Sequence, residues 1–402
     1  MWRLTSGKAL VAGASAAILL LPFAIHNGML LSLACLAATM AVATLSYSIL
    51  LGQTGLLSFG HALYVGLGGF AVANLTQAAE IHGWSWFSVA YAPLFGGLLS
   101  LAVALVLGFI NSRRTGVVFA MITLGLAELV HAYAITQSGF FGGDAGVSFD
   151  RTSGEPLMGW SFGPQVQVYG LILVWMILCL AIVAAFRASV LGDLCRAVRD
   201  NEERVEFLGF NPRRIRYLAF CLSAFVAGVA GGLAAINFEV VSAQVLSLQQ
   251  SSAILVATFI GGATSLWGSI AGALVYVFFY SVVSSVTEAW PFHLGIVFMA
   301  TVLFAPRGFA GLVQELPGRL HAHWRQLGAF RFGLHTASAM ALVMLYVGAV
   351  EAVYTVAHGQ AREWTSSVQW VLAGALVVVA GLPFALARLR PSPAVANERA
   401  IA

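Results

Sequence analysis

Glu128 and His131 are two ionisable residues within an otherwise apolar stretch, 116–136. A spacing of three places both side chains on the same face of a helix. Ionisable groups in apolar segments are costly and often functional, so the pair could move protons or line a polar pathway. A structural ion pair is the third possibility, and the residues alone leave all three open.

A glycine-rich break with several polar residues follows Leu51. Glycine lets a helix unwind, and unwound backbone offers hydrogen-bonding groups to a solute or to water. The alternative is a tight turn beside a seam of closely packed small residues. On the first interpretation this break contributes Gly52, Gln53, Thr54, Ser58 and His61 to a translocation pathway, and Glu128 joins them if it lines the same pathway.

The most highly charged segment, 187–216, holds seven Arg and five acidic residues. Five positions recur through it at helical spacing, which predicts one amphipathic helix that ends at Gly209. A short helix of mixed charge suits docking into a groove of a soluble partner, whereas the alternative is a helix that rests on lipid headgroups. The residues on the predicted inner face are Leu194, Val198, Asn201, Val205 and Leu208.

The elements that position these residues are expected to lie in a membrane. The chain has 402 residues, of which 60% are hydrophobic and 9% are charged, whereas soluble domains carry roughly 25% charged residues. The basic residues lie between apolar runs, so they indicate membrane topology rather than nucleic-acid binding. Spans of about 20 apolar residues are predicted near 9–25, 29–51, 61–78, 91–110, 116–136, 168–186, 217–237, 250–262, 269–287, 293–305, 335–357 and 368–388.

The distribution of basic residues gives an independent test of these spans. With the N-terminus in the cytoplasm, only Arg151 and Arg362 of the 20 Lys and Arg residues fall outside. Cytoplasmic loops are enriched in Lys and Arg, so both termini are predicted to be cytoplasmic. The span at 250–262 is short and could be a half-helix that does not cross.

A polar segment at 306–334 separates the first ten spans from the last two. We therefore expect an all-α polytopic integral membrane protein with about ten core transmembrane helices plus an appended C-terminal two-helix hairpin. The predicted parts are a permease core at 1–312, a cytoplasmic linker at 313–334, and the hairpin with the C-terminal tail at 335–402.

Nothing in the sequence predicts a catalytic centre. The four cysteines show no spacing typical of a metal site, and no Gly-x4-Gly-Lys-Ser/Thr loop is present to hold nucleotide phosphates. We expect no catalytic residue, no metal and no cofactor bound by this chain.

Several motifs occur in a fixed order at 51–62, 192–209, 220–232, 261–268 and 304–312. Together they resemble the branched-chain amino acid (LIV-type) ABC transporter permease family, over about 30–312. The resemblance implies the transmembrane permease subunit of an ATP-driven importer for branched-chain amino acids or related small organic solutes. It also implies a multi-pass protein of the bacterial inner membrane.

The resemblance further implies a set of partners. These are a second permease subunit, two cytoplasmic ATP-binding subunits that carry the ATP, and a periplasmic solute-binding protein that meets the glycine-rich segment 141–146. The implied ATPase-coupling residues are Arg196, Arg199, Asp200, Asn201, Glu202, Glu203 and Gly209. The alternatives are a proton-coupled secondary carrier that uses Glu128 and His131, or a passive channel, and neither has an obvious use for the mixed-charge helix.

Overall fold

The computed structural model describes residues 28–311 except 85–86, 157–158, 286 and 306–307. Four of the predicted features lie outside the described residues. They are the first span at 9–25, the linker at 313–334, and the two spans of the hairpin at 335–357 and 368–388.

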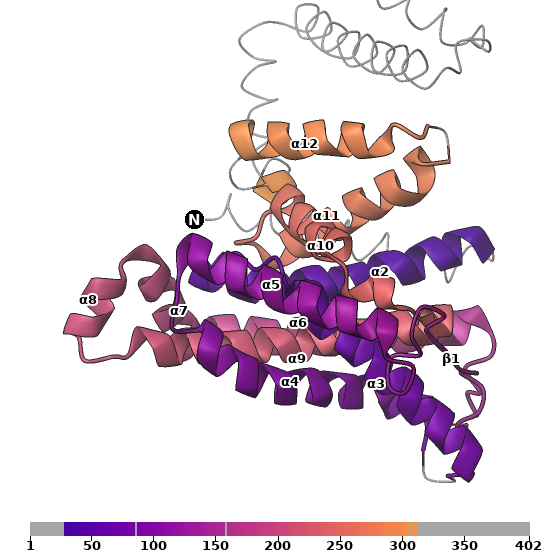
Figure 1. The fold of residues 1–402 in the computed structure, drawn as a ribbon. Coiled ribbons are helices and arrows are strands. Elements are labelled where there is room, and N and C mark those ends of the chain that lie inside the picture. The colour runs from indigo at the N-terminus through magenta and orange to yellow at the C-terminus, as the bar shows by residue number, and fades with distance from the viewer. Residues whose placement is uncertain (1–27, 85–86, 157–158, 286, 306–307, 312–402) are drawn as a thin grey trace, which may run out of the picture. The chain divides into compact units, whose positions relative to one another are not determined.

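Helices make up most of the described chain (Figure 1). The α-helices are α2 (Gly28–Ser48), α3 (His61–His82), α4 (Ala92–Asn111), α5 (Gly116–Thr136), α6 (Gln165–Ala188), α7 (Val190–Asp200), α8 (Glu202–Phe207), α9 (Pro212–Phe238), α10 (Leu248–Gly261), α11 (Leu266–Val277) and α12 (Trp290–Phe304). Shorter elements are the π-helical turns η1 (Ile49–Thr54) and η4 (Phe278–Val283), the 3-10 turns η2 (Val89–Tyr91) and η3 (Ala243–Leu246), and the strands β1 (Val147–Ser148) and β2 (Val240–Val241).

Six described segments are long and apolar enough to cross a membrane, and each overlaps a predicted span. They are Gly28–Thr54, Val89–Asn111, Gly116–Thr136, Gln165–Ala188, Pro212–Phe238 and Leu266–Val283. This confirms the all-helical, polytopic membrane architecture. α3 and α10 also coincide with predicted spans but are not among the six, and α10, with 14 residues, is only about 21 Å long. The count of ten core spans therefore stays a prediction.

The described chain divides into two compact units. The first contains residues 28–282 and 296–311, and all of the contacts discussed below lie within it. The second contains residues 283–295, where the Thr287 N–H donates to the Val283 carbonyl over 2.9 Å.

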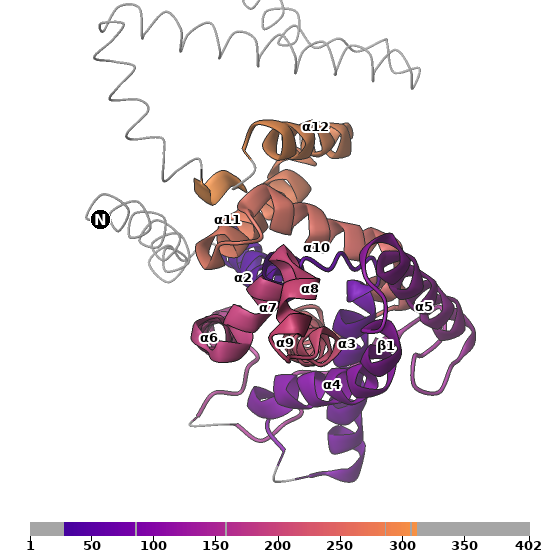
Figure 2. The same cartoon turned by 90° about the vertical axis from the view of Figure 1, so that its left-hand side faces the viewer.

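α9 is the central helix of the first unit, and α2, α3 and α4 pack along it (Figure 2). Glycines bring the backbones of α3 and α9 into direct contact. A Cβ atom on Gly68 would collide with the backbone of Gly228, and one on Gly231 would collide with the Val65 carbonyl. Helices in lipid associate through such close packing of small residues, because water is not there to drive apolar surfaces together.

Gly231→Ala is expected to lower the melting temperature of the purified protein, because the added methyl group has to push α3 away from α9. Overpacking of this kind costs about 1–3 kcal/mol. Gly125→Ala is the matched control, since nothing lies within 4 Å of a Cβ atom at Gly125. Equal melting temperatures for the two variants, measured in the same detergent, would contradict the packing described here.

The bundle has two chemically distinct ends. At one end, here called the α7–α8 end, the chain turns from α6 through α7 and α8 into α9 (Figure 1). At the other, the β1–β2 end, Val147 pairs with Val241 in an antiparallel two-stranded sheet. The charged segment 187–216 and the glycine-rich segment 141–146 therefore lie at opposite ends.

α2 and η1 together form one candidate membrane span, here called the interrupted crossing. The segment that follows it turns back into the bundle. Gly55 has a φ of +70°, a left-handed conformation that favours glycine, and residues 55–60 are not helical. α3 then begins at His61, whose Nε2 lies 2.7 Å from Ser46 Oγ. Ser46 precedes Thr54 by eight residues, so α3 starts about 12 Å inside the bundle from the end of η1.

A second interruption follows α9 at the β1–β2 end. Glu239 has a φ of +57°, and the chain continues through β2 and η3 before α10 begins at Leu248. The Ala62 N–H, in the first turn of α3, donates to Ser251 Oγ in the first turn of α10 over 3.0 Å. The two interrupted segments, which approach from opposite ends, therefore meet within the bundle.

Candidate functional site

The charged segment forms two helices, so the prediction of one continuous helix is wrong. α7 ends at Asp200, and Asn201 is extended, with φ −161° and ψ 105°. The Asn201 side chain accepts a hydrogen bond from the Arg204 N–H over 2.9 Å, which makes Asn201 the N-cap of α8. Asparagine stabilises this arrangement because its short side chain satisfies a free N–H at the start of a helix.

Because the helix breaks at Asn201, only part of the predicted inner face of 194–208 is buried. Val198 and Val205 are buried, but Asn201 and Leu208 are exposed. The predicted stop at Gly209 is confirmed: Gly209 has a φ of +86°, and its N–H donates to the Glu206 carbonyl.

Two of the predicted coupling residues, Arg196 and Arg199, contact the interrupted crossing of α2 and η1. Arg199 Nη1 donates to the Gly52 carbonyl over 2.6 Å, and Arg196 Nη1 donates to Gln53 Oε1 over 2.9 Å. The last carbonyls of a helix have no partners within it, and cations stabilise this end of the helix dipole. Arg199 of α7 therefore caps the end of η1, and Arg196 holds the Gln53 side chain beside it.

A third arginine contacts the second interrupted segment, at the end of α10, close to the contacts of Arg196 and Arg199. Arg187, near the end of α6, donates to the Thr264 carbonyl in the turn after α10. Gly52 lies directly against the backbone of Ala263, where a Cβ atom would not fit. Arg187, Arg196 and Arg199, here called the arginine cluster, thus join α6 and α7 to both interrupted segments at the α7–α8 end.

The other predicted coupling residues have different environments. Glu202 forms two hydrogen bonds with the buried Arg216 of α9, at 2.9 and 2.6 Å. This bidentate contact with Arg216 holds the pKa of the Glu202 carboxyl below its usual range. Asp200 accepts a hydrogen bond from Arg199 over 3.1 Å, and Glu203 is exposed on α8.

An apolar surface at the tip of α8 was missed by the sequence analysis. Phe207 is 91% exposed, and Leu208 and Phe210 are also exposed. Large apolar side chains on a surface mark an interaction site when they occur together. The sequence 207–210 holds this signal, but the apolar spacing through 194–208 predicts that Leu208 lies on the inner face of a continuous helix.

Five of the six predicted pathway residues are buried in the first unit. Gln53 contacts Arg196, Thr54 donates to the Leu50 carbonyl over 2.7 Å, and Gly52 contacts Arg199. The other buried members are Ser58 and His61.

Ser58 and His61 lie in the turn that enters α3. The Tyr47 hydroxyl donates to the Ser58 carbonyl over 2.9 Å, and the Tyr47 ring packs edge-on against His61. The Ser46 hydroxyl donates to the Ala43 carbonyl, so the His61 Nε2–H has to be the donor to Ser46 Oγ. These contacts position the interrupted crossing, and a role of His61 in the translocation pathway stays a prediction.

Glu128, the sixth predicted pathway residue, is exposed on α5. Its Oε2 lies 3.6 Å from Nδ1 of His131, so the predicted placement of both residues on one helix face is confirmed. The carboxyl side chain is 47% exposed and that of His131 is 20% exposed.

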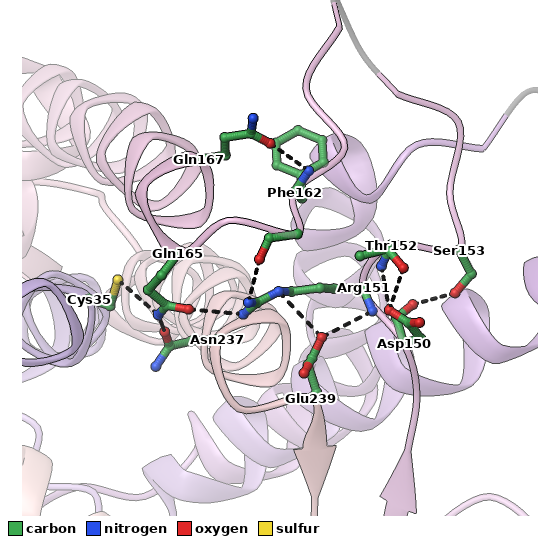
Figure 3. Close-up of polar contacts among 11 residues, drawn as sticks. Cys35, Asp150, Arg151, Thr152, Ser153, Phe162, Gln165, Gln167, Asn237 and Glu239 are labelled. Atoms are coloured by element: carbon green, nitrogen blue, oxygen red, sulfur yellow. Dashed lines mark hydrogen bonds and ion pairs between the residues drawn. The ribbon is translucent and has the colours of Figure 1, made fainter. Parts of the chain in front are cut away.

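Arg151 is the centre of a polar network at the β1–β2 end (Figure 3). Its Nε lies 3.3 Å from Glu239 Oε1, while its Nη1 donates to Gln165 Oε1 over 3.2 Å and its Nη2 to the Gly163 carbonyl over 2.9 Å. Gln165 in turn donates to Asn237 over 2.8 Å. The network fixes the loop after α5 to the start of α6 and the end of α9.

Long apolar helices, two interrupted segments that meet inside the bundle, and a charged segment that contacts both define a membrane permease. Residues 29–305 match the family described as "Branched-chain amino acid transport system / permease component", and the chain belongs to this family. The matched residues include every contact of the arginine cluster.

Several known permeases are similar to this chain. The high-affinity branched-chain amino acid transport system permease protein LivM of Escherichia coli is 26% identical over 308 residues, covering 71% of each chain. The fructose import permease protein FruF of Bifidobacterium longum is 23% identical over 62% of this chain and 70% of its own. LivH of Escherichia coli is 23% identical over 60% of this chain and 80% of its own. No solved structure matches this chain.

Glu202→Gln is expected to destabilise α8, because it removes the charged partner of the buried Arg216. A hydrogen bond to a charged group contributes about 1.5–3 kcal/mol. Hydrogen exchange of the α8 amides should therefore become faster. Exchange as slow as that of the unaltered protein would contradict this role.

Glu203→Gln is the control for that experiment, since Glu203 is exposed on the same helix turn. Acidification of the unaltered protein should speed hydrogen exchange of the α8 amides in the same way as Glu202→Gln. The depressed pKa of Glu202 means that its contribution is present above the ordinary carboxyl pKa and is lost as the pH falls through the depressed value.

Proposed function

We propose that this chain is one of two permease subunits in an ATP-driven importer for branched-chain amino acids or related small organic solutes. ATP is bound and hydrolysed by separate cytoplasmic subunits, and a periplasmic solute-binding protein delivers the solute. The observation that carries this proposal is the arginine cluster, because it connects the charged surface helices to both interrupted segments.

The orientation of the chain follows from its charges. Arg113 and Arg114, in the turn between α4 and α5, are exposed, and the segment 187–216 adds seven more arginines. Basic residues accumulate on the cytoplasmic side, so the α7–α8 end is the cytoplasmic end in this proposal. The β1–β2 end then faces the solute-binding protein.

The ATP-binding subunit docks on the tip of α8 rather than on the arginines. Arg196, Arg199 and Glu202 are already engaged within this chain, whereas Phe207, Leu208 and Phe210 are exposed. Apolar and aromatic side chains of this kind are typical anchors of protein interfaces.

The arginine cluster then transmits the movement of α7 and α8. When ATP binding draws the two ATP-binding subunits together, α8 moves with its partner, and α7 shifts relative to η1 and the turn after α10. Such a shift favours one of two packed arrangements of the interrupted segments, which is how a local contact alternates access to a pathway. A secondary carrier or a channel, which uses no nucleotide, has no need for this connection.

Phe207→Ser is expected to abolish co-purification of the ATP-binding subunit from native membranes, because it removes the most exposed apolar anchor of α8. Ile81→Ser is the matched control, since Ile81 is 73% exposed at the end of α3, away from α8. If Phe207→Ser retains the ATP-binding subunit at full stoichiometry, α8 is not the docking surface. If the unaltered chain moves solute without nucleotide, the importer itself is wrong.

Arg199→Met is expected to separate ATP hydrolysis from transport. The methionine keeps an aliphatic side chain against Gly55 but cannot donate to the Gly52 carbonyl. The complex should still assemble and hydrolyse ATP in proteoliposomes, while solute uptake falls by about ten-fold or more, as expected for a lost charge-assisted hydrogen bond.

Arg114→Met controls for the loss of one exposed arginine at the same end of the bundle. An equal loss of uptake in both variants would argue that overall charge matters, and not the contact with Gly52.

A further inference from the structure

The exposed face of α5 differs from those of the other peripheral helices. The exposed residues of α4 and α6 are all apolar, including Leu98, Ala102 and Ile177, as expected for helices that face lipid. α5 alone among these three exposes a charged side chain, that of Glu128, in line with the small, exposed Gly125 one turn earlier.

Glu128 lies well inside α5 and not at either of its ends. It is about 18 Å along the helix from Gly116 and about 12 Å from Thr136. A carboxylate at this depth is costly against hydrocarbon, so the face that carries it is expected to contact water or protein rather than lipid tails. The contact with His131 uses only one carboxylate oxygen, and the other keeps its capacity as an acceptor.

More polar side chains lie on the neighbouring elements. α5 packs against η3 and α10 in the first unit, and Figure 2 shows α5 at the periphery of that unit. Gln244 of η3 and Gln249 of α10 are exposed, and Ser252 is partly exposed. α5, η3 and the first turn of α10, which are neighbouring elements, therefore expose a carboxylate and two amides and partly expose an imidazole.

We infer that this surface is one wall of the solute pathway, completed by the second permease subunit, and that Glu128 receives the ammonium group of the solute. The inference rests on the proposed function and names the substrate class within it. A carboxylate accepts charge-assisted hydrogen bonds from an ammonium group, whereas a sugar or a simple carboxylic acid offers no such cation. The pathway thus selects solutes with a free amine.

Cysteine labelling tests the position of the wall. Gly125→Cys and Ala102→Cys place a thiol at the middle of the exposed faces of α5 and α4, respectively. The four native cysteines are buried and give a low background. In the assembled transporter in membranes, a charged, membrane-impermeant methanethiosulfonate should modify Gly125→Cys and leave Ala102→Cys unmodified. Equal labelling at both positions, or none at Gly125→Cys, overturns the inference.

Uptake measurements test the role of Glu128. The reconstituted complex with its solute-binding protein is given leucine, 4-methylpentanoate (leucine without its amine) or fructose. Leucine should be transported, and Glu128→Gln should raise its KM by about ten-fold or more, the equivalent of one charge-assisted hydrogen bond. Glu155→Gln, which neutralises an exposed carboxylate in the loop before α6, should leave the KM unchanged.

The outcomes separate the two levels of the proposal. ATP-dependent uptake of leucine with an unchanged KM in Glu128→Gln overturns the inference alone, and so does ATP-dependent uptake of fructose or 4-methylpentanoate in place of leucine. Absence of ATP-dependent uptake of all three solutes in the unaltered complex counts against the proposed function and the inference together.

Discussion

The connection between the surface helices and the interior of the bundle depends on the hydrogen bond from Arg199 to the Gly52 carbonyl. An interrupted helix within a membrane protein leaves carbonyls without partners, and each unsatisfied group is costly where water is excluded. The guanidinium supplies the donor and also places a positive charge at the C-terminal end of α2 and η1. Gly52 and Gly55 make this possible, because a side chain at either position would collide with the 263–264 backbone or with the Arg199 stem.

This contact also links the surface helices α7 and α8 to the interior of the bundle. Arg196 and Arg199 hold α7 against η1. Arg187, at the end of α6, contacts the turn after α10. η1 leads to the start of α3, and the turn at 262–265 ends α10, whose first turn meets α3 through Ser251 and Ala62. A movement imposed on α7 therefore has a short, hydrogen-bonded route to the interior of the bundle.

The sequence predicted the membrane class, six of the long apolar helices and the placement of Glu128 and His131 on one helix face, because these depend on composition and on local spacing. It did not predict the break at Asn201, since the apolar spacing continues through a residue whose side chain competes with the helix backbone. Nor could it show that Arg196 and Arg199 reach Gln53 and Gly52, more than 140 residues earlier in the chain. Contacts of that kind depend on tertiary packing and leave no local pattern.

In this mechanism the α7–α8 end and the interrupted segments move as one. Hydrogen exchange of the assembled transporter, with and without trapped ATP, tests it most directly. Amides of η1, of residues 55–60 and of the turn at 262–265 should change their protection together with those of α7 and α8. A change confined to α7 and α8, with η1 and the turn unaffected, would contradict it.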